Sequence, residues 1–307
     1  MIVLGSSDAG AKKYLKSINF SKYKKIKFLN SKTSLIKINN SKIDLIITGS
    51  AQGNSLDKEL IKFGKKKKIN TISIIEHWTN YMSRFVLYKK KFLPDYILVN
   101  DQIAYKDAIK EGLPKNKIHI AGNVFIENLT KKKIKKNLSN WAQKLKKNNK
   151  NIFIFISEKI KGVKSIKKEY SLDEFETIKK LIKEFKNDDL LIIKCHPEEN
   201  ISKYNEFKKK NVLVKKKINL ADLVYLPKKI IGIKSNLLIE LSNFRNDIIS
   251  YRPKKDKKFI GEKLGILKLV RNDLKRALYS KIKNKNLIKK KFKGSNNKIN
   301  NFLKNIK

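Results

Sequence analysis

The sequence of 307 residues has one cysteine, five prolines and few acidic residues, and these shortages exclude several classes of protein. The single Cys195 rules out an intramolecular disulfide and a cysteine-based metal cluster. No apolar run approaches the roughly 20 residues of a membrane span, and a strand-like pattern begins where a secretory signal would need a basic segment and a long apolar core. We therefore expect a cytoplasmic protein.

The charge is strongly one-sided, with 74 basic residues against 27 acidic ones and a formal net charge of +47. Nearly all the basic residues are lysines spread along the whole chain, and they accompany abundant asparagine and isoleucine, as is typical of an AT-rich genome. A nucleic-acid site would be localised and richer in arginine, whose planar guanidinium suits phosphate. We therefore expect no specific nucleic-acid partner. Charge alone still predicts attraction to anionic surfaces, including peripheral association with the inner face of a membrane.

Apolar segments alternate with helix-compatible stretches along most of the chain, which is typical of parallel βαβ units. The expected strands are 2–5, 26–29, 43–48, 71–75, 96–100 and 117–121 in the first half, and 152–156, 190–194, 211–214, 222–226, 230–233 and 247–250 in the second. Helices are expected at 54–67, 102–111 and 172–186, with Asn54 and Asp101 as caps of the first two.

The length allows two hydrophobic cores of ordinary size. We predict an α/β fold in which two Rossmann-like domains face a central cleft. The predicted ranges are 1–128 for the N-terminal domain, 129–150 for a linker with a surface helix, 151–280 for the second domain, and 281–307 for a basic tail that ends in a helix.

Polar residues follow a buried strand of the first domain, at the edge where open α/β sheets bind their ligands. Glu76 and His77 come directly after this strand and are candidates for a general base. Beside them, Trp78 and Tyr81 would form an aromatic wall suited to sugar stacking. The alternative is that these two rings and Phe85 form the core stripe of a helix.

The turn after the first strand combines small residues with one carboxylate. It resembles a phosphate loop, but it lacks a lysine directly after its second glycine and the Ser or Thr that would hold Mg²⁺, which disfavours an NTPase. Gly10 allows another molecule to approach the backbone closely, and we expect Asp8 to project into the cleft. The absence of G-x-G-x-x-G argues against a dinucleotide oxidoreductase. No metal or cofactor is predicted.

Two segments of the second domain place polar groups where an anion would bind. His196 follows an apolar strand, and Pro197 fixes the exit of the chain and so the direction of the imidazole. Gly232 ends another strand that turns into a helix, with Ser235 as N-cap and free N–H groups suited to phosphate. A structural histidine and a simple cap are the alternatives, but two such segments in one domain favour an anion site.

With these motifs, the chain resembles the GT-B superfamily of glycosyltransferases and nucleotide-sugar epimerases. The layout of residues 1–255 carries the resemblance, together with segments 94–101, 112–118 and 122–123 of the first domain. In the second domain, segments 194–197 and 232–240 resemble the His-Pro and Ser-Ser/Thr motifs of bacterial sialyltransferases and capsule-type transferases.

The resemblance implies a metal-independent glycosyltransferase of cell-surface polysaccharide biosynthesis, which moves a sugar from a nucleotide-sugar donor to a glycan or lipid-linked acceptor. His196 would stabilise the leaving phosphate, whose charge grows in the transition state. Ser235 and Asn236 would contact the donor phosphate or ribose, and Glu240 would bind ribose hydroxyls.

The base that activates the acceptor would then come from the first domain, with His77 or Glu76 ahead of Asp8. The sequence departs from the sialyltransferases because their paired-acid-Gly motif is not evident and Asn236 stands where they have Ser or Thr. Two alternatives remain. One is a nucleotide-sugar epimerase of the same fold, which needs several carboxylates and an arginine-rich phosphate site. The other is a catalytically silent GT-B-like scaffold that binds anionic surfaces.

Overall fold

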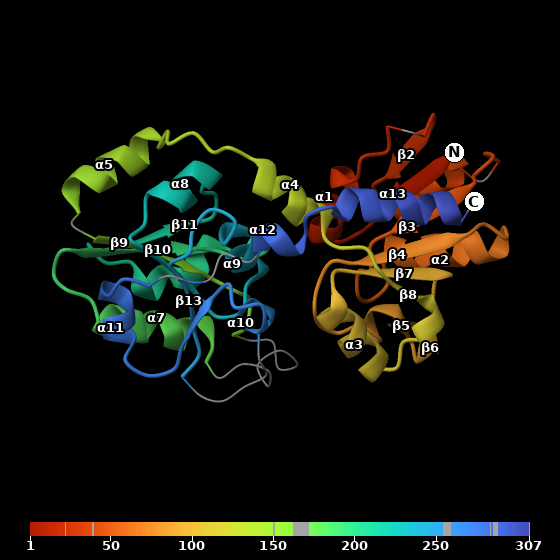
Figure 1. Cartoon of the computed structure of the whole chain (residues 1–307). Coiled ribbons are helices and arrows are strands. Elements are labelled where there is room, and N and C mark those ends of the chain that lie inside the picture. Colours follow the sequence, from red (N-terminus) through yellow and green to blue (C-terminus); the bar gives the residue numbers. More distant parts are fainter. Residues whose placement is uncertain are drawn as a thin grey trace. The chain divides into compact units, whose positions relative to one another are not determined.

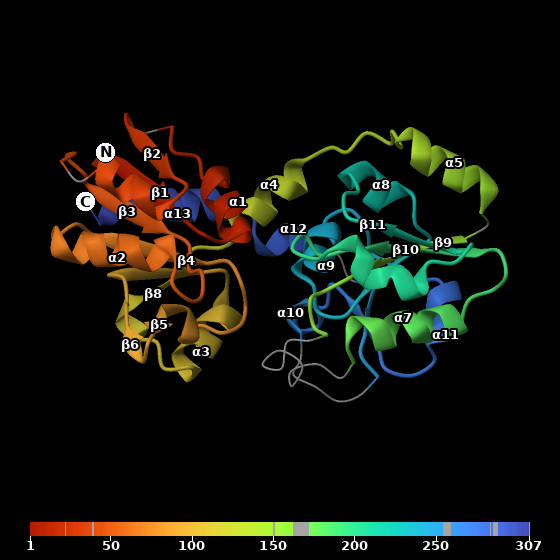
Figure 2. The same ribbon diagram turned by 180° about the vertical axis from the view of Figure 1, so that it is seen from behind.

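The computed structural model describes residues 1–307 except 22, 39, 150, 162–171, 254–258, 283, 285–287 and 307. The chain forms two compact units (Figures 1 and 2). The first unit comprises Met1–Asn128 and Lys291–Lys307, and the second comprises Leu129–Lys290. The C-terminal segment therefore belongs to the same unit as the N-terminus.

The first unit is built on a six-stranded parallel sheet. Its strands are β1 (Ile2–Gly5), β2 (Ile26–Leu29), β3 (Leu45–Thr48), β4 (Thr71–Ile75), β7 (Tyr96–Val99) and β8 (Ile118–Ile120). They pair in the order β2-β1-β3-β4-β7-β8. The order reverses between β1 and β3, so the carboxyl ends of these two strands flank the crevice where doubly wound sheets bind ligands.

Alternate residues of these strands enter two different hydrophobic clusters, as the period of two in a strand requires. On one face, Leu4 and Ile47 pack with α1 (Ala9–Ser17), α4 (Val124–Lys131) and α13 (Ser295–Asn305). On the other face, Val3 and Ile46 pack with α2 (Leu56–Lys66) and the 3-10 helix η1 (Lys32–Ile38). Figures 1 and 2 show the blue C-terminal helix α13 against the red and orange strands of this unit.

The remaining elements of the first unit lie between β4 and β8. They are η2 (Ser83–Phe85), the antiparallel pair β5 (Val86–Leu87) and β6 (Lys90–Lys91), α3 (Gln102–Lys110) and η3 (Lys115–Lys117). Asp101 is the N-cap of α3, as the sequence predicts. The predicted cap Asn54 is wrong by one residue, because Ser55 caps α2 by accepting the N–H of Lys58.

The second unit has its own six-stranded parallel sheet. Its strands are β9 (Asn151–Ile156), β10 (Asp189–Lys194), β11 (Val212–Lys215), β12 (Lys229–Gly232), β13 (Ile248–Tyr251) and β14 (Lys268–Val270). They pair in the order β11-β10-β9-β12-β13-β14, which reverses between β9 and β12. The helices are α5 (Asn140–Asn148), α7 (Glu174–Lys183), η4 (Ile201–Phe207), α8 (Leu220–Tyr225), α9 (Asn236–Leu241), α10 (Ile260–Lys263), α11 (Leu274–Tyr279) and α12 (Ile288–Lys291).

The two parallel sheets confirm the predicted α/β class with two Rossmann-like halves. The strand expected at 222–226 is wrong, because these residues lie mainly in helix α8, which Asn219 caps by accepting the N–H of Asp222. Strand β14 was not predicted, since three residues carry too little pattern. In the described part of the chain, no helix is long and apolar enough to cross a membrane.

Candidate functional site

Asp8, Glu76 and His77 meet at the carboxyl edge of the first sheet. Glu76 and His77 directly follow β4, and Asp8 is the N-cap of α1, just after β1. One ligand atom from each of the three side chains lies within 4.8 Å of the other two. The Nε2 atom of His77 is 3.1 Å from Glu76 Oε1. The structure thus brings together the three residues that the sequence predicts as the catalytic group.

Two glycines make this meeting possible. A Cβ atom at Gly49, which follows β3, would lie 2.4 Å from Ala11 Cβ, so the start of α1 can pack against this strand end only if residue 49 has no side chain. A Cβ atom at Gly10 would lie 3.1 Å from Asp8 Oδ1 and 3.3 Å from Glu76 Oε1. Gly10, predicted as a position of close approach, therefore leaves space directly beside the two carboxylates.

The two carboxylates differ in their surroundings. Burial raises the pKa of Asp8, but the N–H of Ala11, at 2.9 Å, and the nearby His77 outweigh it and hold the pKa below its usual value. Glu76 is 9% exposed, and among the described residues its carboxylate faces the His77 imidazole at 3.1 Å but accepts no backbone N–H. A buried carboxylate with so few donors costs stability, and such groups are typical of reactive sites.

The backbone below Glu76 is fixed by two asparagines that the sequence analysis missed. Asn100, directly after β7, donates its side-chain N–H to the Glu76 carbonyl oxygen at 2.8 Å. Asn123, just before α4, in turn donates to Asn100 Oδ1 at 3.1 Å. Both are buried. The available signal was that Asn100 directly follows β7 and Asn123 lies in the short turn after β8, since such positions gather at one edge of a parallel sheet.

The aromatic residues after His77 do not form an exposed wall. Trp78 is 8% exposed and donates its indole N–H to Asp101 Oδ2 at 2.9 Å. Tyr81 and Phe85 are buried as well. The prediction that Trp78 and Tyr81 stack on a sugar is therefore wrong, and these rings belong to the core, although from a loop and η2 instead of a long helix.

Two carboxylates and an imidazole at this spacing can do two kinds of chemistry. They can remove, hold and return a proton, because the three side chains lie within reach of one another. They are also the ligand types that bind divalent transition metals such as Zn²⁺. The predicted absence of a metal thus stays a prediction, which a chelator can test.

In the second unit, the predicted anion-binding residues lie at the carboxyl ends of β10 and β12. Ser235 caps α9 by accepting the N–H of Leu237 at 3.3 Å. Glu158, just after β9, accepts the backbone N–H of Lys234 at 2.7 Å. The ends of β9 and β12 are thereby tied together at the reversal of strand order, the position where this type of sheet binds nucleotides.

Helix α9 carries the other predicted nucleotide ligands. Gly232 is the last residue of β12, and a Cβ atom there would lie 2.9 Å from Leu238 Cδ1, so the glycine permits α9 to pack closely on the strand end. Asn236 begins the helix, and Glu240 lies one turn further; both side chains are half-buried.

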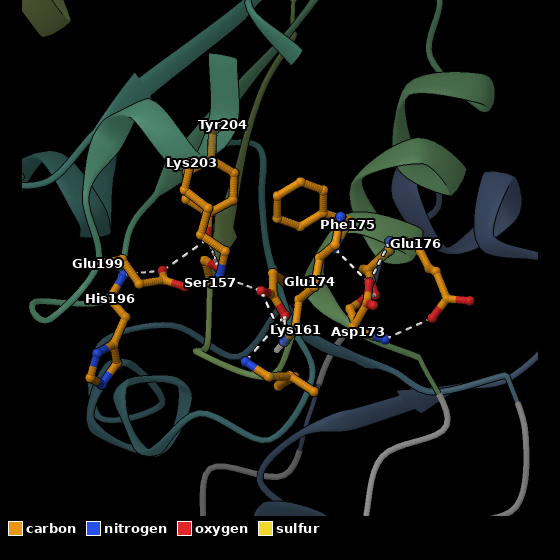
Figure 3. A network of polar contacts seen from close by, with 12 residues as sticks. Ser157, Lys161, Asp173, Glu174, Phe175, Glu176, His196, Glu199, Lys203 and Tyr204 are labelled. Atoms are coloured by element: carbon orange, nitrogen blue, oxygen red, sulfur yellow. Dashed lines mark hydrogen bonds and ion pairs between the residues drawn. The ribbon is translucent and has the colours of Figure 1, made fainter. Parts of the chain in front are cut away.

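The environment of His196 determines which nitrogen carries its proton. Its Nδ1 accepts the N–H of Glu198 at 3.3 Å, so Nε2 carries the hydrogen in the neutral ring. Burial lowers the pKa of His196, and this effect outweighs the opposite influence of Glu198 and Glu199. The imidazole points away from the polar network beside it (Figure 3). Near neutral pH, His196 followed by Pro197 is therefore a fixed, uncharged N–H donor.

Comparison with known proteins rests on structure alone. No protein-family model matches the chain, and no curated protein matches it. Among solved structures, the UDP-N-acetylglucosamine 2-epimerase of Rickettsia bellii is 15% identical, with a TM-score of 0.67 over 99% of this chain and 95% of that one. The Neisseria meningitidis UDP-GlcNAc 2-epimerase bound to UDP-GlcNAc is 14% identical, with a TM-score of 0.65 over 99% of both chains.

A third solved structure, the Methanocaldococcus jannaschii UDP-GlcNAc 2-epimerase in complex with UDP-GlcNAc and UDP, is 14% identical, with a TM-score of 0.64 over 99% of both chains. The chain has the fold of these epimerases. That fold is GT-B-like, as the sequence predicts. The prediction of a glycosyltransferase is corrected, because the structural neighbours are nucleotide-sugar epimerases. Nothing among them supports a sialyltransferase or a specific role for a His-Pro motif.

Proposed function

We propose that the chain is a nucleotide-sugar epimerase that acts on a UDP-linked N-acetylhexosamine. The observation that carries the proposal is the group of Asp8, Glu76 and His77, in which the buried Glu76 carboxylate lies 3.1 Å from the His77 imidazole, at the strand ends of an epimerase fold. This reading takes up the alternative that the sequence left open. The sequence shows neither the several carboxylates nor the arginine-rich phosphate site that such an epimerase needs; Asp8 and Glu76 supply two carboxylates within 4.8 Å of His77.

The reaction explains why proton-transfer groups are needed. Inversion at C2 of a UDP-sugar requires a base that removes the C2 proton and an acid that returns it to the opposite face. As the C2–H bond breaks, its electron pair enters the C1–C2 bond and the C1–O bond to UDP breaks; the reverse addition of UDP restores the sugar. Glu76 is the candidate base because its carboxylate is buried beside Asp8 and His77 at the strand ends. His77, at 3.1 Å, can share the proton.

The second unit supplies groups suited to a diphosphate. His196 offers a neutral Nε2–H. A hydrogen bond from this group to a phosphate oxygen becomes stronger as the oxygen takes up charge on leaving C1. Ser235 and Asn236 begin α9 at the reversal of strand order. We assign these residues and Glu240 to the nucleotide. Proton transfer coupled to the loss and return of UDP requires neither a cofactor nor a sugar acceptor.

The proposal is tested by incubating the protein with UDP-GlcNAc in D₂O and following the sugar by NMR. We expect deuterium at C2 and formation of the C2 epimer. Glu76→Gln is expected to lower the rate by about 100-fold or more, whereas Glu59→Gln, on the surface of α2, serves as the matched control and keeps it. A chelator is expected to leave the rate unchanged. UDP-sugar consumption that retains the C2 proton, or absence of UDP binding, would contradict the proposal.

A further inference from the structure

A buried polar network lies beside the His-Pro turn of the second unit (Figure 3). We call it the Lys203 network; its members are Ser157, Glu174, Glu199, Lys203 and Tyr204. They come from the end of β9, the start of α7, the turn after β10, and η4. All except Lys203 are buried, and both carboxylates are at most 4% exposed.

Lys203 is the centre of this network. Its Nζ pairs with Glu174 Oε1 and with Glu199 Oε1. Burial lowers the pKa of Lys203, but the two carboxylates outweigh it and raise the pKa above its usual value. One ammonium thus faces two buried carboxylates. A buried charge that loses its partner is strongly destabilising, so both carboxylates depend on Lys203.

Lys203 supplies one positive charge for two carboxylates, so N–H and O–H donors must stabilise the remaining negative charge. The positions of these donors show which chain segments the network fixes. Glu174 accepts the backbone N–H groups of Ile160 and Lys161, each at 3.2 Å or less, and thereby fixes the chain that follows β9. Glu199 accepts the backbone N–H of His196 at 3.0 Å. Lys203 therefore joins the segment after β9 to the turn after β10, at the edge assigned above to the nucleotide.

A second link reinforces the same connection. The hydroxyl of Tyr204 donates to Glu199 Oε2 at 2.8 Å, and it is also hydrogen-bonded to Ser157, the first residue after β9. The ring of Phe175 stacks on Tyr204 with centroids 5.6 Å apart and closes the network on the side of α7. Every described charged group of the network is thus compensated, and the two strand ends are fixed relative to each other.

We infer that Lys203 is a positioning residue for nucleotide diphosphate binding, which acts by holding the His196 turn and segment 157–161 in one arrangement. The inference rests on the proposed function. A role in stability alone would not require charges, because apolar side chains of similar volume stabilise such a place equally well or better. An ion network makes sense where a particular geometry of exposed donors must be kept.

The test is a double-mutant cycle on UDP affinity, measured by calorimetric titration of the full chain. The proteins are wild type, Lys203→Met, His196→Ala and the double variant. We expect each single change to weaken UDP binding about tenfold, and the double variant to be hardly weaker than either single one, because Lys203 acts through His196. Lys208→Met removes an exposed lysine just beyond η4 and controls for the loss of one positive charge; it is expected to keep wild-type affinity at the same salt concentration.

The outcomes separate this inference from the proposed function. If His196→Ala weakens UDP binding while Lys203→Met does not, or if the two effects multiply to about 100-fold, the positioning role is refuted and the epimerase proposal stands. If wild type does not bind UDP, both fail. Should Lys203→Met not fold at the titration temperature, Glu199→Gln takes its place in the cycle, since it keeps the side-chain shape and removes the charge that pairs with Lys203. The inference is supported if Glu199→Gln weakens UDP binding and adds no further loss in combination with His196→Ala. It is refuted if Glu199→Gln leaves the affinity unchanged or if the two losses multiply.

Discussion

Gly10 and Gly64 are helical glycines for which the same substitution should have opposite effects. In Gly10→Ala, the new Cβ meets Asp8 Oδ1 at 3.1 Å and Glu76 Oε1 at 3.3 Å, at the edge of a space that the proposed reaction uses. Alanine favours a helix by up to about 1 kcal/mol over glycine, which offsets the strain on the Asp8 cap, so we expect the free energy of unfolding to stay close to that of the wild type. Turnover of UDP-GlcNAc should fall, because the carboxylates must move apart.

Gly64→Ala is the matched control in helix α2. Its Cβ would lie 2.3 Å from Thr71 Cγ2 and 3.1 Å from the Ile69 carbonyl oxygen, which forces the helix away from β4. We expect a loss of about 1–3 kcal/mol in urea unfolding, with turnover per folded molecule unchanged. Full turnover in Gly10→Ala would show that the space beside Asp8 and Glu76 serves no substrate.

The location of individual site residues could be predicted from the sequence because the ends of the strands could be predicted. Asp8, Glu76 and His77 follow strands of one parallel sheet, and the carboxyl ends of such strands share an edge, so the sequence predicts the right neighbourhood. The contacts were not predictable. Glu174 and Lys203 lie 29 residues apart in different elements, and one lysine among 74 basic residues gives no signal of which carboxylates it pairs with.

At the level of elements, the contact between β8 and the C-terminal helix α13 should make the first unit sensitive to acid. His119 of β8 packs on Phe302 with ring centroids 4.7 Å apart and on Tyr96 at 5.8 Å. Burial lowers the pKa of His119. The unfolded chain therefore takes up a proton below about pH 6.5 that the folded chain resists, and stability is lost as the pH falls from that value.

His119→Phe keeps a ring at this contact and removes the titration. In urea unfolding between pH 7.5 and 5, we expect the wild type to lose stability relative to the variant as the pH falls. The pKa of His196 is also lowered, so this residue likewise makes the second unit less stable as the pH falls. Its contribution is the same in wild type and variant. Asp8 and Glu199, with lowered pKa values, lose their contribution only as the pH falls below about 4.5. Parallel curves would contradict the assignment to His119.

Most elements were predictable because buried parallel strands have a strong local signature. Strands β1, β3 and β4 are buried at every position and appear in the sequence as nearly continuous apolar runs, interrupted only by small polar residues such as Ser73. The error at 222–226 has a physical reason. Its apolar and aromatic residues favour a strand, but the side chain of Asn219 accepts the N–H of Asp222 and starts helix α8. A cap outweighed the local propensity.

For the whole molecule, the sequence predicts the fold correctly but not the type of reaction. A fold needs apolar residues at strand positions and caps at helix starts, which many sequences satisfy; hence structures only 14–15% identical share it over 99% of this chain. Transfer and epimerisation both use a nucleotide sugar on such a fold. The choice between them depends on a few side chains at strand ends, and a fold does not fix a function.

The net charge of +47 predicts how stability and nucleotide binding depend on salt. Positive charges distributed over the surface repel one another in the folded state, and raising the ionic strength from about 0.01 M to about 0.15 M shortens the Debye length from about 30 Å to about 8 Å. We therefore expect the melting temperature to rise by about 5 °C over this range.

Binding of UDP through charge alone should vanish over the same range of ionic strength, because it depends on unscreened attraction. Binding through fixed donors should persist. A thermal shift by UDP that survives at the higher salt concentration and is lost in His196→Ala would assign binding to the strand-end site. A shift that disappears with salt in wild type and variant alike would assign it to the lysine-rich surface.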